Sequence, residues 1–224
     1  MSNGIKPVVQ TYLEVTEVKH SIAKKALDYS VKSFTYLQSV HHAKDMNFIS
    51  VNDLKQLVNA YSNADGGKLK DRCLLKGLFK EGFSGKNCYA GAPYLFIDID
   101  VKENENAHLL HPETNQRFFN ELKKVCVICW RSNSGNGIAG VLHVPQLKDY
   151  LNDQRQHHLQ AGKAITDYLS DYLQELTGIK KVQFDNAQSK FRQVRFLAEQ
   201  QQPRFLNNAP FEFSYTITEK EKVN

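Results

Sequence analysis

Apolar residues are grouped most regularly after residue 93, in short runs separated by polar or glycine-containing stretches. The run from Tyr94 to Asp100 stays apolar until two aspartates close it, which predicts a buried strand ending at a polar edge. The runs from Val125 to Trp130 and from Ile138 to Val144 have the length and side chains of strands. The turn from Arg131 to Gly137 joins them so closely that we predict a hairpin.

Two helices are predicted from residue spacing. The first opens with Pro112 and Thr114, because proline is favoured in a first turn, and buries Phe118, Phe119 and Leu122. The second has apolar residues at helical spacing and a glycine as its stop: Ile165, Tyr168, Leu169, Tyr172, Leu173 and Leu176, followed by Gly178.

The last predicted strand combines two apolar segments, Val182 to Phe184 and Val194 to Leu197. The element order is then strand, helix, strand, strand, helix, strand, which is the ferredoxin-like or RRM-like βαββαβ arrangement of the α+β class. In that arrangement the strands lie in the order 4, 1, 3, 2, with both helices on one face. The end of strand one, the turn between strands two and three, and the start of strand four therefore share one edge.

Alternation along the first strand assigns its side chains to two faces. Leu95, Ile97 and Ile99 are expected to face the helices. The open side of the sheet then carries Tyr94, Phe96, Asp98 and Asp100. On that open side the two aromatic rings either stack a nucleic-acid base or pack beneath the N-terminal part of the chain.

Residues 1–92 are predicted to form an α/β extension packed on a core of residues 93–224, whose last part is a tail. Ser50 to Asp53 resembles a capping box ahead of a helix that carries Leu54 to Tyr61, and 62–70 reads as a loop. Thr11 to Val18 alternates as a strand does, with no partner assigned.

Composition fits a globular chain of 224 residues, without the roughly 20-residue apolar run of a membrane span. Its first residues lack the apolar core of a signal peptide, so we expect no membrane partner and a cytoplasmic location. Lys and Arg outnumber Asp and Glu by 29 to 24, an excess that permits a polyanionic partner without requiring one.

Cys126 and Cys129 form a Cys-x-x-Cys pair inside a predicted strand. Residues three apart on a strand point to opposite faces, which disfavours zinc chelation by this pair. Cys73 and Cys88 are isolated in the sequence, so all four cysteines are expected to be reduced thiols.

Asp98 and Asp100 project from the same face at a strand end, where two like charges repel unless a cation lies between them. Hard oxygen ligands suit Mg²⁺ or Mn²⁺, the ions of phosphoryl and nucleotidyl transfer, and Asp185 is the natural third ligand. These three are the candidate catalytic and metal-binding residues. A solvated strand end, and an aspartate that merely starts a turn, are the plain alternatives.

The turn before the third strand is the candidate nucleotide site, through Ser132, Ser134, Gly135, Asn136 and Gly137. Its glycines allow close backbone approach, and its hydroxyl and amide groups can bind phosphate oxygens. An ordinary hairpin turn would use the same residue types.

Basic residues follow Asp185 closely enough to reach the same pocket, and Lys190, Arg192 and Arg195 are further candidates for nucleotide binding. An arginine can hold a triphosphate through paired hydrogen bonds. Because Arg192 and Arg195 cannot both point inward from a regular strand, Arg195 is favoured.

Three short motifs in order resemble the archaeo-eukaryotic primase superfamily, in particular its primase-polymerase-like group with a VirE N-terminal domain: Phe96-Ile-Asp-Ile-Asp100, Ser134-Gly-Asn-Gly137 and Phe184-Asp185. The similarity spans roughly residues 93–208 and includes an arginine-containing strand at Arg195 and an asparagine-containing tail at Asn207. It implies a two-metal nucleotidyltransferase that binds NTP or dNTP and a DNA template, works in replication of a mobile element, and has a helicase as a possible partner.

The chain departs from that group at Ala139, where catalytic members carry a phosphate-contacting histidine. His143 is on the same strand face but four residues farther along, about 13 Å at 3.3 Å per residue. Ala139 favours one alternative to nucleotidyl transfer, an inactive nucleic-acid-binding module of the same fold. A second alternative is a metal-dependent nuclease that uses the same carboxylates.

Overall fold

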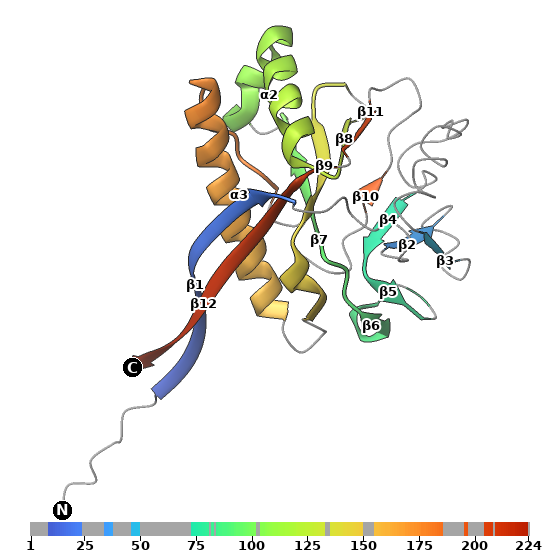
Figure 1. The fold of residues 1–224 in the computed structure, drawn as a ribbon, viewed down its shortest axis with the longest axis vertical. Coiled ribbons are helices and arrows are strands. Elements are labelled where there is room, and N and C mark those ends of the chain that lie inside the picture. Colours follow the sequence, from blue (N-terminus) through green and yellow to red (C-terminus); the bar gives the residue numbers. More distant parts are fainter. Residues whose placement is uncertain are drawn as a thin grey trace, which may run out of the picture.

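The computed structural model describes residues 9–23, 34–37, 46–49, 73–80, 82, 84–101, 104–132, 135–149, 155–185, 195–196, 204–207 and 209–223. The predicted helix after Ser50 and the predicted loop at 62–70 lie outside these ranges. The fold is mixed α+β with a mostly antiparallel main sheet (Figure 1).

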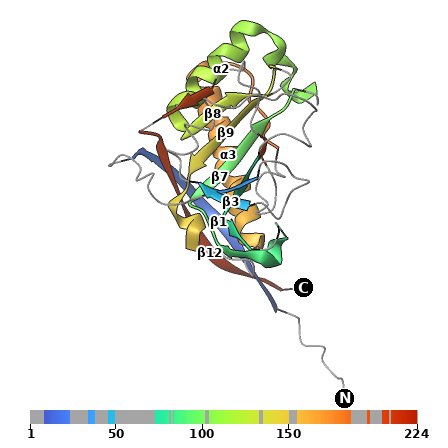
Figure 2. The same cartoon turned by 90° about the vertical axis from the view of Figure 1, so that its right-hand side faces the viewer.

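Six strands form the main sheet, in the order β1-β12-β9-β8-β11, and β7 pairs with β9. Their bounds are β1 (Val9–Ile22), β7 (Tyr94–Ile99), β8 (Ile128–Arg131), β9 (Ile138–His143), β11 (Arg204–Leu206) and β12 (Phe211–Val223). The pairs are antiparallel except for a short parallel contact of β12 with β9. The β8–β9 hairpin is confirmed, and β7, β9 and β8 run side by side across α3 (Figure 2).

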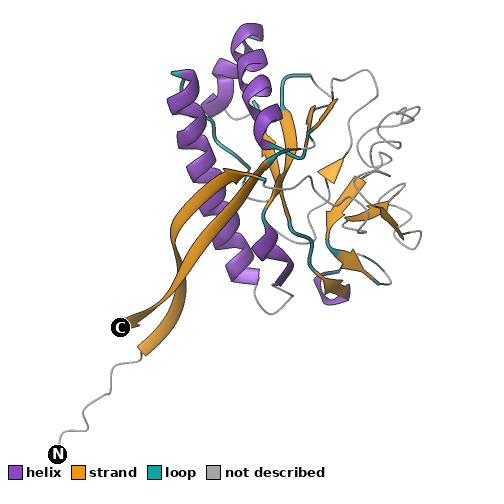
Figure 3. Cartoon of the chain, viewed as in Figure 1, coloured by secondary structure: helices purple, strands orange, loops and turns teal. Residues whose placement is uncertain are grey.

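Both predicted helices are present, as α2 (Pro112–Val125) and α3 (Arg155–Thr177), and both cover the same face of the main sheet (Figure 3). Pro112 lies in the first turn of α2, and Gly178 takes a left-handed φ of 65° directly after α3. The described residues also include three short 3₁₀ helices: η2 (Gly85–Asn87), η3 (Asn104–Leu110) and η4 (Pro145–Asp149).

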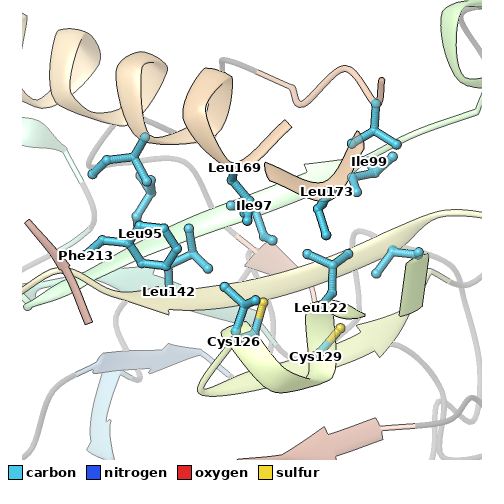
Figure 4. Packing of buried hydrophobic residues seen from close by; sticks show 14 of the residues in the cluster. Leu95, Ile97, Ile99, Leu122, Cys126, Cys129, Leu142, Leu169, Leu173 and Phe213 are labelled. Atoms are coloured by element: carbon cyan, nitrogen blue, oxygen red, sulfur yellow. The ribbon is translucent and has the colours of Figure 1, made fainter. Parts of the chain in front are cut away.

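The core lies between the helices and the sheet (Figure 4). As predicted, Leu95, Ile97 and Ile99 of β7 face it, together with Phe118, Phe119 and Leu122 of α2 and Ile165, Leu169 and Leu173 of α3. β9 passes through this core at Gly140, where a Cβ atom would lie 2.8 Å from Cys126 Sγ. Only glycine at this position lets the β9 backbone lie so close to the Cys126 side chain.

The other face of β7 is covered by a second, four-stranded sheet, in the order β10-β4-β2-β3. Its strands are β2 (Phe34–Leu37), β3 (Met46–Ile49), β4 (Cys73–Lys76) and β10 (Arg195–Phe196); a separate small pair is β5 (Leu78–Phe79) with β6 (Cys88–Ala90). β4 contacts β7, and Tyr94 and Phe96 are 3% and 0% exposed. This face of β7 is therefore not open, and of the two alternatives for the two rings, packing beneath the N-terminal part of the chain is the one observed.

The final predicted strand is also wrong as a single element. Residues 182–185 form no strand, and one hydrogen bond, from Asp185 N to Asp98 O (2.9 Å), joins them to β7. Arg195 and Phe196 instead pair with Leu74 and Cys73 of β4. The two apolar segments are separated by a polar stretch, which lets each join a different neighbour.

β1 and β12 form a long ribbon that extends beyond the helices (Figure 1). It pairs Val9 with Val223 at one end and Ile22 with Phe211 at the other, so the predicted strand from Thr11 to Val18 is confirmed within β1. The early part of the chain thus shares the main sheet with the C-terminal tail. No helix in the described ranges is both long and apolar enough to cross a membrane.

All four cysteines are free, as expected of reduced thiols, and all are buried. The alternation argument does not apply to the Cys126 and Cys129 pair, however. Cys126 precedes β8, so it does not follow strand alternation, and it lies with Cys129 in the same core cluster (Figure 4). Burial, and secondarily the neighbouring Cys129 thiol, raise the pKa of the Cys126 thiol, which keeps it protonated.

Two leucines of α3 test the assignment of its buried face. Leu173 is fully buried, so Leu173→Ala should lower the free energy of unfolding by about 2–5 kcal/mol. Leu176, one turn away, is 48% exposed, so Leu176→Ala should cost less than about 1 kcal/mol. Urea titration followed by circular dichroism measures both, and equal losses would contradict the assignment.

Candidate functional site

The three predicted carboxylates lie around one pocket of about 430 Å³. The pocket is at the end of β7, and its lining residues are Asp98, Asp100, Glu105, Asn106, Gln183, Phe184 and Asp185. Asp98 is the last polar residue within β7, and Asp100 follows the strand directly. The backbone hydrogen bond from Asp185 N to Asp98 O brings the third carboxylate to the same edge.

Asn106 holds this edge together and was not identified from the sequence. Its side-chain Nδ2 donates to Asp100 O and to Gln183 O, both at 2.9 Å, and its Oδ1 accepts from Gln183 N at 2.9 Å. It is 3% exposed and lies at a break in η3, with φ −103° and ψ 17°. A polar residue among others in a predicted loop gives no signal that it bridges two segments, so only the structure identifies it.

Asp98 carries the most perturbed charge in the pocket. Burial raises its pKa, and the charges of Asp185 and Asp100 raise it further, whereas Arg195 lowers it without cancelling the shift. Arg195 Nη1 lies 2.8 Å from Asp98 Oδ2, and the two side chains are only 11% and 22% exposed. The favoured arginine of the sequence analysis therefore reaches the candidate site from the second sheet.

Lys76 is a second cation on that sheet, also missed by the sequence analysis. Arg195 pairs with Leu74, two residues before Lys76, so Arg195 and Lys76 share one face of β4 and β10. Lys76 is fully buried; burial, and then repulsion from Arg195, lower its pKa to about 7. A lysine that closes an apolar run is ordinarily a strand end meeting solvent, which is why the pattern did not single it out.

The turn at Ser132 is a tight hairpin connection beside the end of β7. Ser132 N donates to Gly137 O and Gly137 N donates to Ser132 Oγ, both at 2.9 Å, and Gly135 has a φ of 79°. A Cβ on Gly137 would lie 2.9 Å from Ile99 O, so glycine is required where the turn meets β7. Asn115 of α2 fixes the turn by donating to Asn136 O at 2.7 Å.

None of Ser132, Gly135, Asn136 and Gly137 lines the acidic pocket, and their nucleotide-binding role stays a prediction. The predicted nucleotide-binding residues Ser134, Lys190 and Arg192 lie outside the described residues.

Ala139 lies directly opposite Asp98 in the β7–β9 pairing, whereas His143 lies opposite Tyr94 at the other end. Trp130 of β8 is the neighbour of Ala139 on its other side and is 1% exposed. His143 is thus at the far end of the strand from the acidic pocket.

Across the part of the chain that the structure describes, no group of three or more His, Cys, Asp and Glu side chains is arranged to hold a metal ion as it stands. Comparisons with the models of known protein families, with curated proteins and with solved structures find no match for this chain.

Replacing Asn106 tests its bridging role. Asn106→Ala removes the buried hydrogen bonds of its amide with Asp100 O and with the Gln183 backbone, and an unsatisfied buried polar group costs about 1–3 kcal/mol. We expect the backbone amide of Asp185, which donates to Asp98 O, to lose its hydrogen-exchange protection before the amides of β7 do. Asn120→Ala, which removes only an exposed contact with Gln116, is the control and should leave that amide unchanged. Equal exchange at Asp185 in both variants would contradict the role.

The raised pKa of Asp98 predicts a pH-dependent stability. Ionisation of this carboxyl destabilises the folded chain. The stability that the protonated Asp98 carboxyl contributes is therefore fully present below its pKa in the unfolded chain and is lost as the pH rises through its pKa in the folded chain. Metal-free Asp98→Asn should therefore be at least as stable as the wild type at pH 7. Its advantage should vanish below about pH 4. Urea titrations across this range in EDTA measure the difference, and an advantage that grows on acidification would refute the sign.

Proposed function

We propose that this chain is a primase-polymerase-like nucleotidyltransferase that joins nucleotides at the pocket formed by Asp98, Asp100 and Asp185. The observation that carries the proposal is the meeting of these carboxylates, from segments far apart in sequence, around one pocket at the end of β7. Two-metal nucleotidyl transfer needs carboxylates that can bridge divalent cations at such an edge.

The donor types suit Mg²⁺ or Mn²⁺, because hard cations prefer carboxylate and carbonyl oxygens. The three described carboxylates would have to close around an ion to bind it. Asp98, Asp100 and Asp185 would hold the ions, which supply charge neutralisation at the attacking hydroxyl and the departing pyrophosphate. Asn106 keeps the two carboxylate-bearing segments in register.

The strand arrangement supports a ferredoxin-like core. β7, β9 and β8 lie in the expected order, α2 and α3 cover one face, and residues 182–185 run beside β7 where a fourth strand would stand. We propose that this segment is a frayed fourth strand.

For a primase-polymerase-like enzyme the substrates are NTP or dNTP and a DNA template. The proposed setting is cytoplasmic replication of a mobile element, with a helicase as a partner.

A catalytically silent nucleic-acid-binding module is the second candidate. It is favoured by Ala139, since the position beside Asp98 carries no histidine to contact a phosphate. Such a module would bind DNA in EDTA and incorporate no nucleotide. A nuclease using the same carboxylates would instead cleave DNA when Mn²⁺ is added without nucleotides.

Primer extension with Mn²⁺ tests the proposal. Asp98→Asn and Asp185→Asn should each lower incorporation at least about a hundredfold, the scale on which loss of one charged or polar group at a reacting centre lowers kcat. Asp171→Asn, which alters an exposed carboxylate of α3, is the matched control and should retain activity. Full incorporation by either site variant would exclude these carboxylates as the catalytic centre.

A further inference from the structure

The Arg195 guanidinium pairs with Asp98, the carboxylate that the proposed chemistry needs as a ligand for a divalent cation. Its Nη1 lies 2.8 Å from Asp98 Oδ2, and both side chains are largely shielded from water. Attraction between charges is stronger in such a setting than at an exposed surface. A divalent cation that binds Asp98 must therefore compete with the Arg195 guanidinium for the same oxygen.

The guanidinium has donors left for another anion. Arg195 Nε is buried without a hydrogen-bond partner in the described structure, so the contact with Asp98 leaves part of the fork unused. Phosphate oxygens fit this planar fork through paired hydrogen bonds. Lys76, fully buried on the same sheet face, repels Arg195 and so does not hold it in place.

The pocket beside the pair is strongly acidic, with Asp100, Glu105 and Asp185 in its lining next to Asp98. A triphosphate cannot approach these carboxylates without cations between them. Arg195 contacts Asp98, the most buried carboxylate of the pocket. When a divalent ion neutralises Asp98 in its place, the guanidinium is free to leave that carboxylate and bind a phosphate.

We propose that Arg195 couples nucleotide binding to metal binding: in the free protein it neutralises Asp98 and opposes the cation there, and the triphosphate draws its guanidinium away. The inference rests on the proposed function, because it concerns the same metal and nucleotide site. Linkage then requires each ligand to strengthen the other, as Arg195 can satisfy only one partner at a time.

Arg195→Gln separates the two bindings in the full chain. Without nucleotide, Mn²⁺ affinity, measured from the electron paramagnetic resonance of the free ion, should rise about tenfold, within the usual range of coupling between linked sites. At saturating Mn²⁺, anisotropy of a fluorescent non-hydrolysable nucleotide should show its affinity falling about tenfold. These opposite signs are not expected of a residue with a structural role, whose loss would weaken both.

Two variants keep the test specific. Arg195→Lys retains a cation beside Asp98 and should keep Mn²⁺ affinity within about threefold of the wild type. Lys181→Gln removes a cation that pairs with Asp171 instead, and should change Mn²⁺ affinity by less than about twofold.

The outcomes distinguish this inference from the proposed function. Mn²⁺ binding that Asp98→Asn abolishes but Arg195→Gln leaves unchanged or weakens overturns the coupling and leaves the metal site standing. Mn²⁺ binding by neither the wild type nor Arg195→Gln overturns both.

Discussion

The charge of Asp98, held at the half-buried end of β7, is the constraint on which the candidate site depends. Burial and two neighbouring carboxylates make the ionised form costly, and the Arg195 guanidinium compensates only in part. The carboxylates therefore stay together because the backbone structure around them holds them in place. The β7–β9 pairing fixes Asp98, and the amide of Asn106 fixes the segment that brings Asp185. Rigid backbone on both sides of a charge cluster is what lets mutually repelling groups stay together.

Local periodicity was enough to predict β7, α2, β8, β9 and α3, because each buries a face that its own residues define. The meeting of Asp98, Asp100 and Asp185 was predicted from an order of four strands. The three residues do line one pocket, although residues 182–185 form no strand and are joined to β7 by a single backbone hydrogen bond. For Tyr94 and Phe96 the sequence left two alternatives open, base stacking and packing beneath the N-terminal part of the chain, and the structure shows the second. Alternation within β7 could not decide between them, because it carries no information about what covers a face, and here the cover is β4.

The parts of the site that the sequence did not reveal are those whose role depends on contacts between distant segments. Asn106 bridges backbone groups of Asp100 and Gln183, and nothing in its own neighbourhood distinguishes it from a loop residue. Lys76 reads as a strand end in the sequence, yet in the fold it is a fully buried cation beside Arg195. Arg195 was favoured by parity, but its approach from the second sheet was not predictable, because its strand partner is β4 and not β7.

The ribbon of β1 and β12 has a consequence for how the chain folds during synthesis. Val9 pairs with Val223 and Ile22 with Phe211, so β1 emerges from the ribosome long before its main partner is made. Until then its backbone donors and acceptors are open to other strands, and closing so long a loop is slow. The ribbon would therefore form as one of the last steps of folding.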